Sequence, residues 1–408
     1  EILMEAVARN DDEIDFSRFD AFALVHPGAG QETDFSGDSP WQLWSGFIDP
    51  VEMEAVLADT LGTPGIPTND LVDGDTFYVD NVMVLPENAS QDGLTFGSLG
   101  IYAYQVGMRL GMIPMYDTTP SSFPNSQGIG AFGLMGYGLY NASGFIPAFP
   151  CAFHRYLMGW AEPETVEGDG TVNITDINSP GPDDTFLVKI EITPTEYFLI
   201  SNRVHDQNMN GRFDFGDANS DGIPANEDTL LGAEFDFFLT ATTNPFHYED
   251  VGGVDVKIVD TGSGIMIWHI DETVIRNQLG IGRYPNDNPG VSGVDLEEAD
   301  GVQDLDRPGG THAFGSWGDS FRDGWYAVFG PETIPASFTN AGTPTDLSIT
   351  ALSLPSPMMG ISISFGEDLP RVTGEIDGTV MNLSPVVAQL DGDAEYELIQ
   401  AADTGMIY

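Results

Sequence analysis

The second half of the chain is a series of short apolar stretches separated by turn-forming residues, and this pattern constrains the fold most. Stretches with the length and composition of strands lie at 185–190, 196–202, 254–259, 265–270, 347–353 and 359–365. Gly, Pro, Asn and Asp stand between them, which is typical of strands joined by turns. We therefore expect residues 166–365 to form a β-rich lobe.

The first part of the chain alternates between two periodicities. Residues 22–26 and 78–85 are apolar in the manner of strands. Residues 50–61 and 99–112 have the apolar spacing of helices, in which every third or fourth residue faces the core. This alternation predicts a lobe of mixed helices and strands over residues 1–165.

These patterns divide the 408 residues into three units. We predict an α+β fold in which the lobe 1–165 packs on the β-rich lobe 166–365. A short linker with two acidic residues and a proline then leads into a third unit, 366–408. No signal peptide opens the chain and the third unit stops within a repeat, so we expect a piece of a longer precursor.

The charge of the chain is strongly one-sided. Asp and Glu number 64 against 13 Lys and Arg, which gives a formal net charge of −51. Such a surface repels nucleic acid and anionic membranes and favours divalent cations. We therefore expect no nucleic-acid partner and no membrane insertion, and no apolar run is long enough for a transmembrane helix. The single cysteine, Cys151, stands in an apolar run typical of a buried thiol.

The predicted helix at 99–112 carries the pattern that matters most for chemistry. Zinc peptidases of the zincin class bear His-Glu-x-x-His on such a helix; the two His bind Zn²⁺ and the Glu activates the metal-bound water. The corresponding residues here are Tyr104-Gln105-Val106-Gly107-Met108. A phenol and a thioether are poor zinc ligands near neutral pH, and an amide is not a useful general base.

The segments around this helix resemble the immune-inhibitor-A-type secreted metallopeptidases in order and spacing. They include GIGAFGLMGYG at 128–138, EYFLISNR at 196–203, GIMIWHIDE at 264–272 and VDLEEADG at 294–301. The resemblance covers roughly residues 1–365 and implies a zincin-like first lobe. It also implies that the third zinc-ligand position falls on Pro114, which has no ligand atom. We therefore expect degenerate catalytic positions, with no Zn²⁺ and no catalysis, at Tyr104, Gln105, Met108 and Pro114.

The strongest chemical signal lies at 206–228, where oxygen-bearing residues recur at alternate positions. From Asp206 the spacing matches an EF-hand loop, with a glycine at the sharp turn and a backbone carbonyl one residue later. A second register overlaps the first and shares Asp217. Together they predict one or two Ca²⁺ ions bound by Asp206, Asn208, Asn210, the Arg212 carbonyl, Asp214, Asp217, Asn219, Asp221, the Ile223 carbonyl and Asp228. A solvated acidic loop is the alternative interpretation.

The third unit resembles the repeat of FG-GAP-type β-propeller blades. Residues 384–399 read SPVVAQLDGDAEYELI, and only one copy is present. The resemblance implies the first blade of a β-propeller. Loops of this kind often bind calcium in such blades, so we expect either a second calcium site or a simple turn at Asp391, Asp393, Glu395 and Glu397.

Two functions from different classes fit these observations. The first is a secreted or cell-surface, catalytically inactive metallopeptidase-like protein that acts as a calcium-stabilised structural or binding module. Its partner would be a protein or further copies of itself in an extracellular assembly. The second is an active secreted metallopeptidase with a non-standard metal site built from His154, His269 or Asp117. The joint loss of both His positions, the Glu and the third ligand favours the first.

Overall fold

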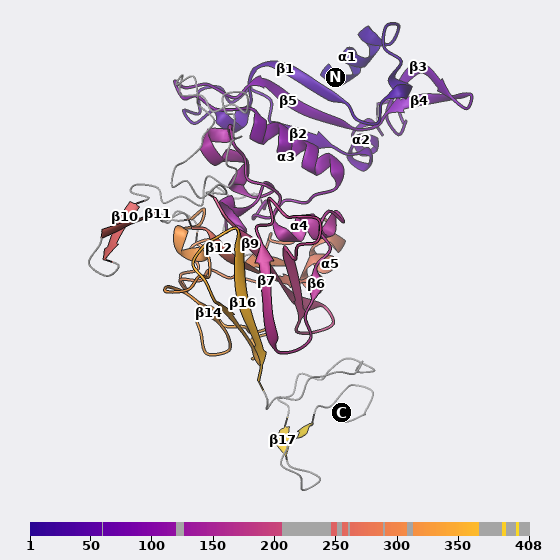
Figure 1. The fold of residues 1–408 in the computed structure, drawn as a ribbon. Coiled ribbons are helices and arrows are strands. Elements are labelled where there is room, and N and C mark those ends of the chain that lie inside the picture. The colour runs from indigo at the N-terminus through magenta and orange to yellow at the C-terminus, as the bar shows by residue number, and fades with distance from the viewer. Residues whose placement is uncertain are drawn as a thin grey trace.

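The fold is that of a computed structural model of the chain. It describes residues 1–58, 60–119, 126–205, 262–288, 290–307 and 313–366, together with the strand backbones at 246–250, 255–259, 386–388 and 397–399. Helices and strands are mixed, and the described residues form no closed barrel and no propeller. In Figure 1 the elements up to α3 lie above a larger region of strands.

The N-terminal lobe is built on a three-stranded sheet with the order β1-β5-β2. Strand β1 runs parallel to β5, and β2 runs antiparallel to it. The strands are β1 (Ala23–Ala29), β2 (Gly46–Ile48) and β5 (Val82–Asn88). The short helices beside the sheet are α1 (Ile2–Asn10), η1 (Phe16–Arg18), η2 (Gln31–Thr33) and α2 (Pro50–Leu57).

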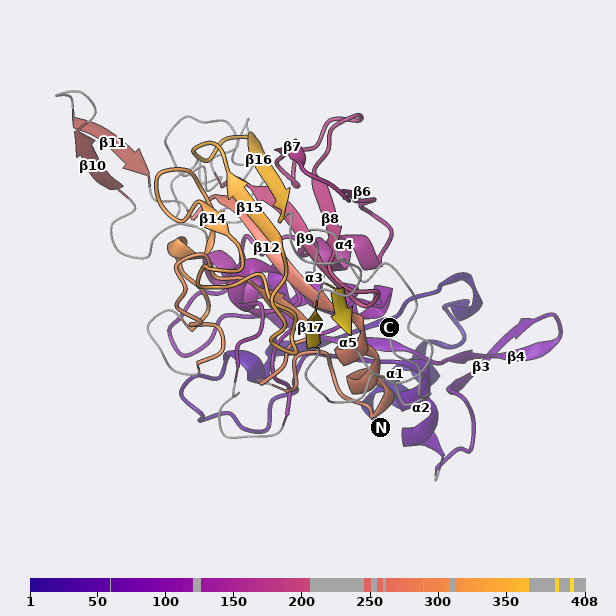
Figure 2. The same cartoon turned by 90° about the horizontal axis from the view of Figure 1, so that it is seen from below.

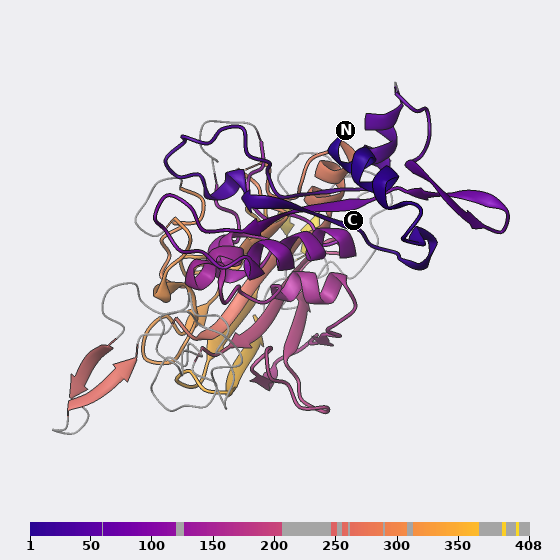
Figure 3. The ribbon, with the colours of Figure 1, turned by 90° about the horizontal axis from the view of Figure 1, so that it is seen from above.

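A hairpin of β3 (Ile66–Val72) and β4 (Asp75–Val79) projects from this lobe, as Figure 3 shows. The strand expected at 78–85 is therefore two strands, because β4 ends at Val79 and β5 begins at Val82. Asp80 and Asn81 lie between them, and the Asn81 side-chain amide donates to Asp80 Oδ1 over 2.8 Å. These two adjacent polar residues are turn-forming types that interrupt the apolar pattern, a signal that the expectation of one strand did not use.

Helix α3 (Leu99–Leu110) packs beneath the three-stranded sheet, close to β2 and β5 (Figure 3). It ends where Gly111 adopts a left-handed conformation with φ 99° and its N–H bonds back to the Gly107 and Met108 carbonyls. This confirms the helix expected at 99–112. The chain then forms η3 (Gly130–Phe132), η4 (Tyr137–Gly144) and α4 (Ala152–Leu157) before it enters the strand region.

Two larger sheets make up most of the described part of the strand region. A five-stranded sheet has the order β13-β12-β9-β8-β6, and a four-stranded sheet has the order β14-β15-β16-β7. The first sheet consists of β6 (Glu164–Thr165), β8 (Leu187–Glu191), β9 (Glu196–Arg203), β12 (Gly264–Asp271) and β13 (Val294–Leu296). The second consists of β7 (Gly170–Thr175), β14 (Val328–Phe329), β15 (Leu347–Ala351) and β16 (Met358–Phe365). The two sheets share a hydrophobic core, and their strands overlap in the view of Figure 2.

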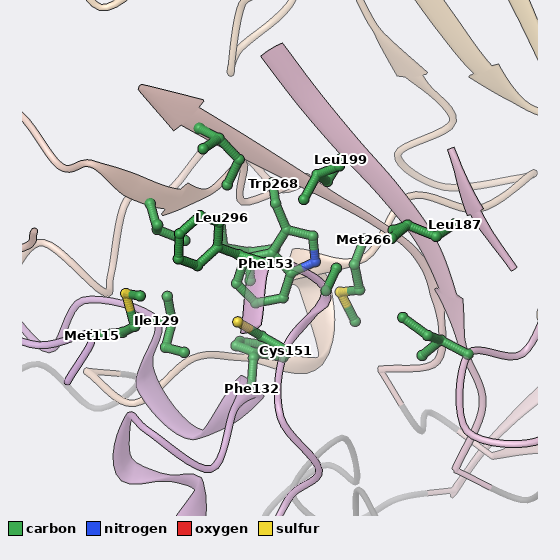
Figure 4. Packing of buried hydrophobic residues seen from close by; sticks show 14 of the residues in the cluster. Met115, Ile129, Phe132, Cys151, Phe153, Leu187, Leu199, Met266, Trp268 and Leu296 are labelled. Carbon is green, nitrogen blue, oxygen red and sulfur yellow. The ribbon is translucent and has the colours of Figure 1, made fainter. Parts of the chain in front are cut away.

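The five-stranded sheet is buried on both faces because alternate side chains of β9 and β12 enter two different cores. Phe198 and Ile267 pack toward the four-stranded sheet. Leu199 and Trp268 point the other way, against the segment that carries η3 and α4, as Figure 4 shows. All eight residues of each strand are buried, which explains the apolar runs at 197–200 and 265–268 within them. The structure confirms the strands expected at 196–202 and 265–270.

The remaining elements are short. They are α5 (Glu272–Gly280), η7 (Trp317–Asp319), and the hairpins β10 (Phe246–Asp250) with β11 (Asp255–Val259) and β17 (Val386–Ala388) with β18 (Glu397–Ile399). Asp271 begins α5 by accepting bonds from the amides of Thr273 and Val274. The hairpin β17–β18 falls within the predicted propeller blade, but most of that segment lies outside the described residues.

Candidate functional site

Helix α3 is held tightly against the segment that follows it, and two glycines make this approach feasible. A Cβ atom on Gly100 would lie 1.7 Å from the Leu139 carbonyl oxygen of η4. A Cβ on Gly107 would lie 2.8 Å from the Met135 sulfur. A side chain at Gly100 would collide with the backbone of η4, and one at Gly107 would force the Met135 side chain to shift, so the two glycines let η4 and Met135 pack against one face of the helix.

The four positions that correspond to the zincin motif are filled by packing side chains. Tyr104 and Gln105 are buried, Met108 is half-buried and Pro114 is buried. Tyr104 and Met108 pack in a small core with Met112, Leu134 and Met135. Neither of the two carboxylate groups that could hold a metal ion among the described residues contains a residue of α3. The only ligand atoms at these positions are therefore a phenol, an amide and a thioether.

Tyrosines gather around Tyr104, and no spacing in the sequence indicates this group. The Tyr104 hydroxyl lies 3.4 Å from the Tyr116 hydroxyl. The Tyr116 ring is tilted against Tyr137 at 5.4 Å between centroids. Burial raises the pKa of Tyr104, with smaller contributions from neighbouring phenols, and burial followed by the charge of Glu32 raises that of Tyr140. Burial also raises the pKa of Tyr137 to about 12. These phenols stay neutral near pH 7, when they are weak ligands.

His154, proposed above as an alternative metal ligand, lies in the core and is fully buried. Its Nε2 lies 2.9 Å from the Ile113 carbonyl oxygen, so this nitrogen carries the hydrogen and donates it. Its Nδ1 lies 3.3 Å from the Cys151 sulfur and accepts from the thiol. Burial lowers the pKa of His154 to about 4 and raises that of the Cys151 thiol. The pair is neutral at physiological pH and both ring nitrogens are in use.

His269 is also buried, between two carboxylates from neighbouring segments. Its Nε2 lies 3.5 Å from Glu196 Oε2 and its Nδ1 lies 3.3 Å from Glu297 Oε1, which are ion-pair distances too long for strong hydrogen bonds. Burial alone would lower the pKa of His269, but the two carboxylates outweigh it and raise the pKa to about 9. A protonated imidazole has no lone pair for a metal, which argues against His269 as a ligand.

Asp117, the third residue of the alternative metal site, is buried and turned toward its own loop. Its Oδ1 accepts bonds from the amide and the hydroxyl of Thr119. Neither group of three candidate ligands among the described residues includes Asp117, His154 or His269. The structure thus gives each of the three a separate local role and does not bring them together as one such group.

The predicted calcium loops fall in parts of the chain that the structure does not describe. All of residues 206–228 lie outside the described residues, as do Asp391, Asp393 and Glu395. Glu397 begins β18, of which the backbone alone is described. These calcium predictions therefore stay predictions.

A different carboxylate group is present in the strand region. Glu298, Asp300 and Asp319 offer oxygen atoms that all lie within 4.8 Å of one another, with Glu298 and Asp319 buried. Glu298 accepts bonds from the amides of Asp304 and Leu305 over 2.6 and 3.1 Å, which hold its loop closed. Asp319 accepts from the amide and hydroxyl of Ser316 in a capping box at η7.

The electrostatics of this group suit a cation. Burial, together with the charge of Asp319, raises the pKa of Glu298 to about 9, and burial raises that of Asp319 to about 7. Carboxyl groups whose ionised forms are this unfavourable gain most from a divalent ion, because oxygen ligands and positive charge stabilise the carboxylates. A more exposed group of three, Asp34, Asp38 and Asp92, lies in the N-terminal lobe.

The sequence carried only part of the signal for this buried group. Glu298 and Asp300 are two residues apart, but Asp319 follows nineteen residues after Asp300. Ala299 N–H bonds to the Asp319 carbonyl over 3.2 Å, and this backbone contact brings the two segments together. No spacing rule for a metal loop covers such a separation.

Comparison with known proteins adds no relative. No family model matches the chain, and neither a curated protein nor a solved structure matches it. The resemblance to the metallopeptidases and to the propeller repeat therefore rests on the residues quoted for it. No helix in the described part of the chain is long and apolar enough to cross a membrane.

Proposed function

We propose that this chain is a secreted or cell-surface, catalytically inactive relative of the zincin metallopeptidases that acts as a binding or structural module. One observation carries the proposal. At the place where the zincin motif would stand, Tyr104 and Met108 are packed among apolar and aromatic side chains and Pro114 is buried. A catalytic zinc site has three protein ligands from His, Asp, Glu or Cys and an open fourth position. The four motif positions offer only a phenol, an amide and a thioether.

Divalent cations would stabilise the module. The candidate ligands are the calcium loops at 206–228 and the buried group of Glu298, Asp300 and Asp319. Carboxylate oxygens are ligands that Ca²⁺ prefers. Extracellular fluids supply that ion at concentrations suited to weak sites, which fits a secreted or surface protein. We also propose that the segment 366–408 opens a β-propeller that extends the module.

The alternative is an active metallopeptidase with a non-standard metal site. The observation that favours it is the group of Glu298, Asp300 and Asp319, the only buried group of three candidate ligands among the described residues. Its oxygens accept bonds from the amides of Asp304, Leu305 and Ser316, and the group contains no histidine nitrogen. A ligand set of carboxylates alone also suits calcium better than zinc, so we rank this function second.

Elemental analysis and a proteolysis assay test the two functions. We expect less than one tenth of a zinc ion per chain after dialysis, and no cleavage of casein above the rate of a buffer control. A chelator such as 1,10-phenanthroline should change nothing. Stoichiometric zinc together with chelator-sensitive cleavage would establish the active enzyme and refute our proposal.

A set of variants at the helix makes the test sharper. Tyr104→His, Gln105→Glu and Met108→His combined would restore the motif, but Pro114 would still supply no third ligand. The variant is therefore expected to bind zinc much more weakly than a three-ligand site. Tight zinc binding by this variant would show that a third ligand is present nearby.

A further inference from the structure

A pocket of about 520 Å³ opens in the N-terminal lobe beside the end of α3. Its walls come from the segment after η1, the beginning of α2, the strand β4 and the residues Met108, Arg109 and Gly111. Met108 is the position of the second zinc-binding His in the resembling peptidases. The pocket therefore lies next to the degenerate site and shares Met108 with it, while its other lining residues are different.

Aromatic rings line much of this pocket. They belong to Phe19, Phe22, Phe47, Phe77 and Tyr78. Phe22 lies 6.4 Å from Phe77 between ring centroids, and this contact holds part of the wall in place. Phe19 is 53% exposed, so its ring is open to a ligand that enters the pocket. The rings offer negatively polarised faces at which a cation is attracted.

Three carboxyl groups stand among the rings, those of Asp20, Asp49 and Asp80. Asp49 accepts a bond from the Glu52 amide as the cap of α2, and Asp80 accepts from the Asn81 side chain. The Asp20 carboxyl group has no hydrogen-bond or ion-pair partner among the described residues. Its carboxylate is therefore available to a ligand.

One cation of the protein borders the pocket, and it is already engaged. Arg109 Nε donates to Asn81 Oδ1 over 3.1 Å, and its guanidinium also donates to the Asp20 carbonyl oxygen. Arg109 forms no ion pair with Asp20, Asp49 or Asp80 in the described part of the chain. The lining thus carries three acidic groups and one basic group, and the basic group forms no ion pair with the acidic ones among the described residues.

We propose that this pocket binds a basic side chain, lysine or arginine, presented by an exposed peptide segment of a protein partner. The aromatic walls suit the aliphatic stem and the face of the cationic group. The carboxylates supply the opposite charge, and the excess of acidic residues over the whole surface attracts a basic partner from a distance. An acidic or purely apolar side chain would lack this complementarity.

This inference gives the chemistry of a partner for the proposed binding role and rests on that role. The zinc and casein measurements test the loss of catalysis, whereas a peptide titration tests the pocket. Either result can fail without the other, so the two proposals are separable.

The experiment follows the methyl signal of Met108 in protein labelled with ¹³C-methyl methionine, assigned by the Met108→Leu variant. The probe is the peptide acetyl-Gly-Lys-Gly-amide. We expect its addition to shift the Met108 signal with a Kd near 1 mM, because a single exposed cation–π and ion-pair contact is weak. Asp20→Asn should weaken binding by about threefold or more, since a charge beside the ammonium is lost.

Two controls decide the interpretation. Asp73→Asn removes the same charge from the exposed turn of the β3–β4 hairpin, outside the pocket lining, and should leave Kd within about twofold because distant exposed charges are screened. A peptide with norleucine in place of lysine should bind at least about fivefold more weakly, because it keeps the stem without the charge. Equal binding of the norleucine peptide, an unchanged Kd for Asp20→Asn, or no shift with the lysine peptide would overturn the proposal.

Discussion

The buried histidine His154 makes the acid stability of the protein depend on one residue in a calculable way. Burial holds its pKa at about 4, compared with 6.5 for an unperturbed histidine. A histidine whose pKa is depressed on folding contributes stability above pH 6.5 and loses it as the pH falls toward 4. Between pH 7 and pH 5 the loss is about 2 kcal/mol, because the unfolded chain takes up the proton and the folded one does not.

The hydrogen bonds of His154 explain why its imidazole stays neutral in the folded protein. His154 Nε2 donates to the Ile113 carbonyl and Nδ1 accepts from the Cys151 thiol. Protonation at Nδ1 would place this N–H against the Cys151 S–H in an apolar core. It would also bury the charge of the imidazolium away from water. His154→Gln keeps an amide donor for Ile113 and cannot titrate, so its stability should not carry this pH dependence.

The assay is urea unfolding of the wild type and His154→Gln at pH 7 and pH 5. Other titrating groups are shared and cancel in the difference between the two proteins. We expect the stability of the wild type relative to the variant to fall by about 2 kcal/mol over this range. The control Cys151→Ser retains a hydroxyl donor to Nδ1 and should keep the wild-type pH dependence. A difference that stays constant between the two pH values would refute the assignment of a buried neutral imidazole.

Two further predictions concern packing and cations. Gly100→Ala should lower the free energy of unfolding by about 3 kcal/mol or more, because its Cβ would meet the Leu139 carbonyl oxygen at 1.7 Å. Gly111→Ala, where the Cβ meets nothing but φ is 99°, should cost only about 1 kcal/mol, and equal losses in urea unfolding would contradict this. Calcium at a hundredfold excess over Kd should stabilise the protein by about 2.7 kcal/mol relative to EGTA. Thermal unfolding of Asp319→Asn and Asp217→Ala shows which site provides the gain, and equal wild-type midpoints in both buffers would exclude both.

Sequence by itself determined the elements whose side chains meet a core on a regular period. The strands at 196–202 and 265–270 were predictable because both faces of the central sheet are buried, so consecutive residues are apolar over 197–200 and 265–268. The pair at 347–353 and 359–365 was predictable because β15 and β16 alternate inward and outward side chains. The helix α3 was predictable from its apolar spacing.

The absence of zinc-ligand chemistry on α3 was also readable from the sequence, because it depends on residue type alone. The ligand atoms that Tyr104, Gln105 and Met108 offer are the same in any fold. What the sequence could not provide was their environment. Burial of Tyr104 against Tyr116, and closure of η4 over the helix at Gly100, depend on segments whose approach no local pattern records.

Tertiary structure decided the sites that join distant segments. Asp319 reaches Glu298 and Asp300 only because its carbonyl pairs with the Ala299 amide, and the pocket beside Met108 exists only because four separate elements converge there. Local sequence reports which residues avoid water and where the chain can turn. It does not report which buried surfaces meet, because that choice is made by packing between residues far apart along the chain.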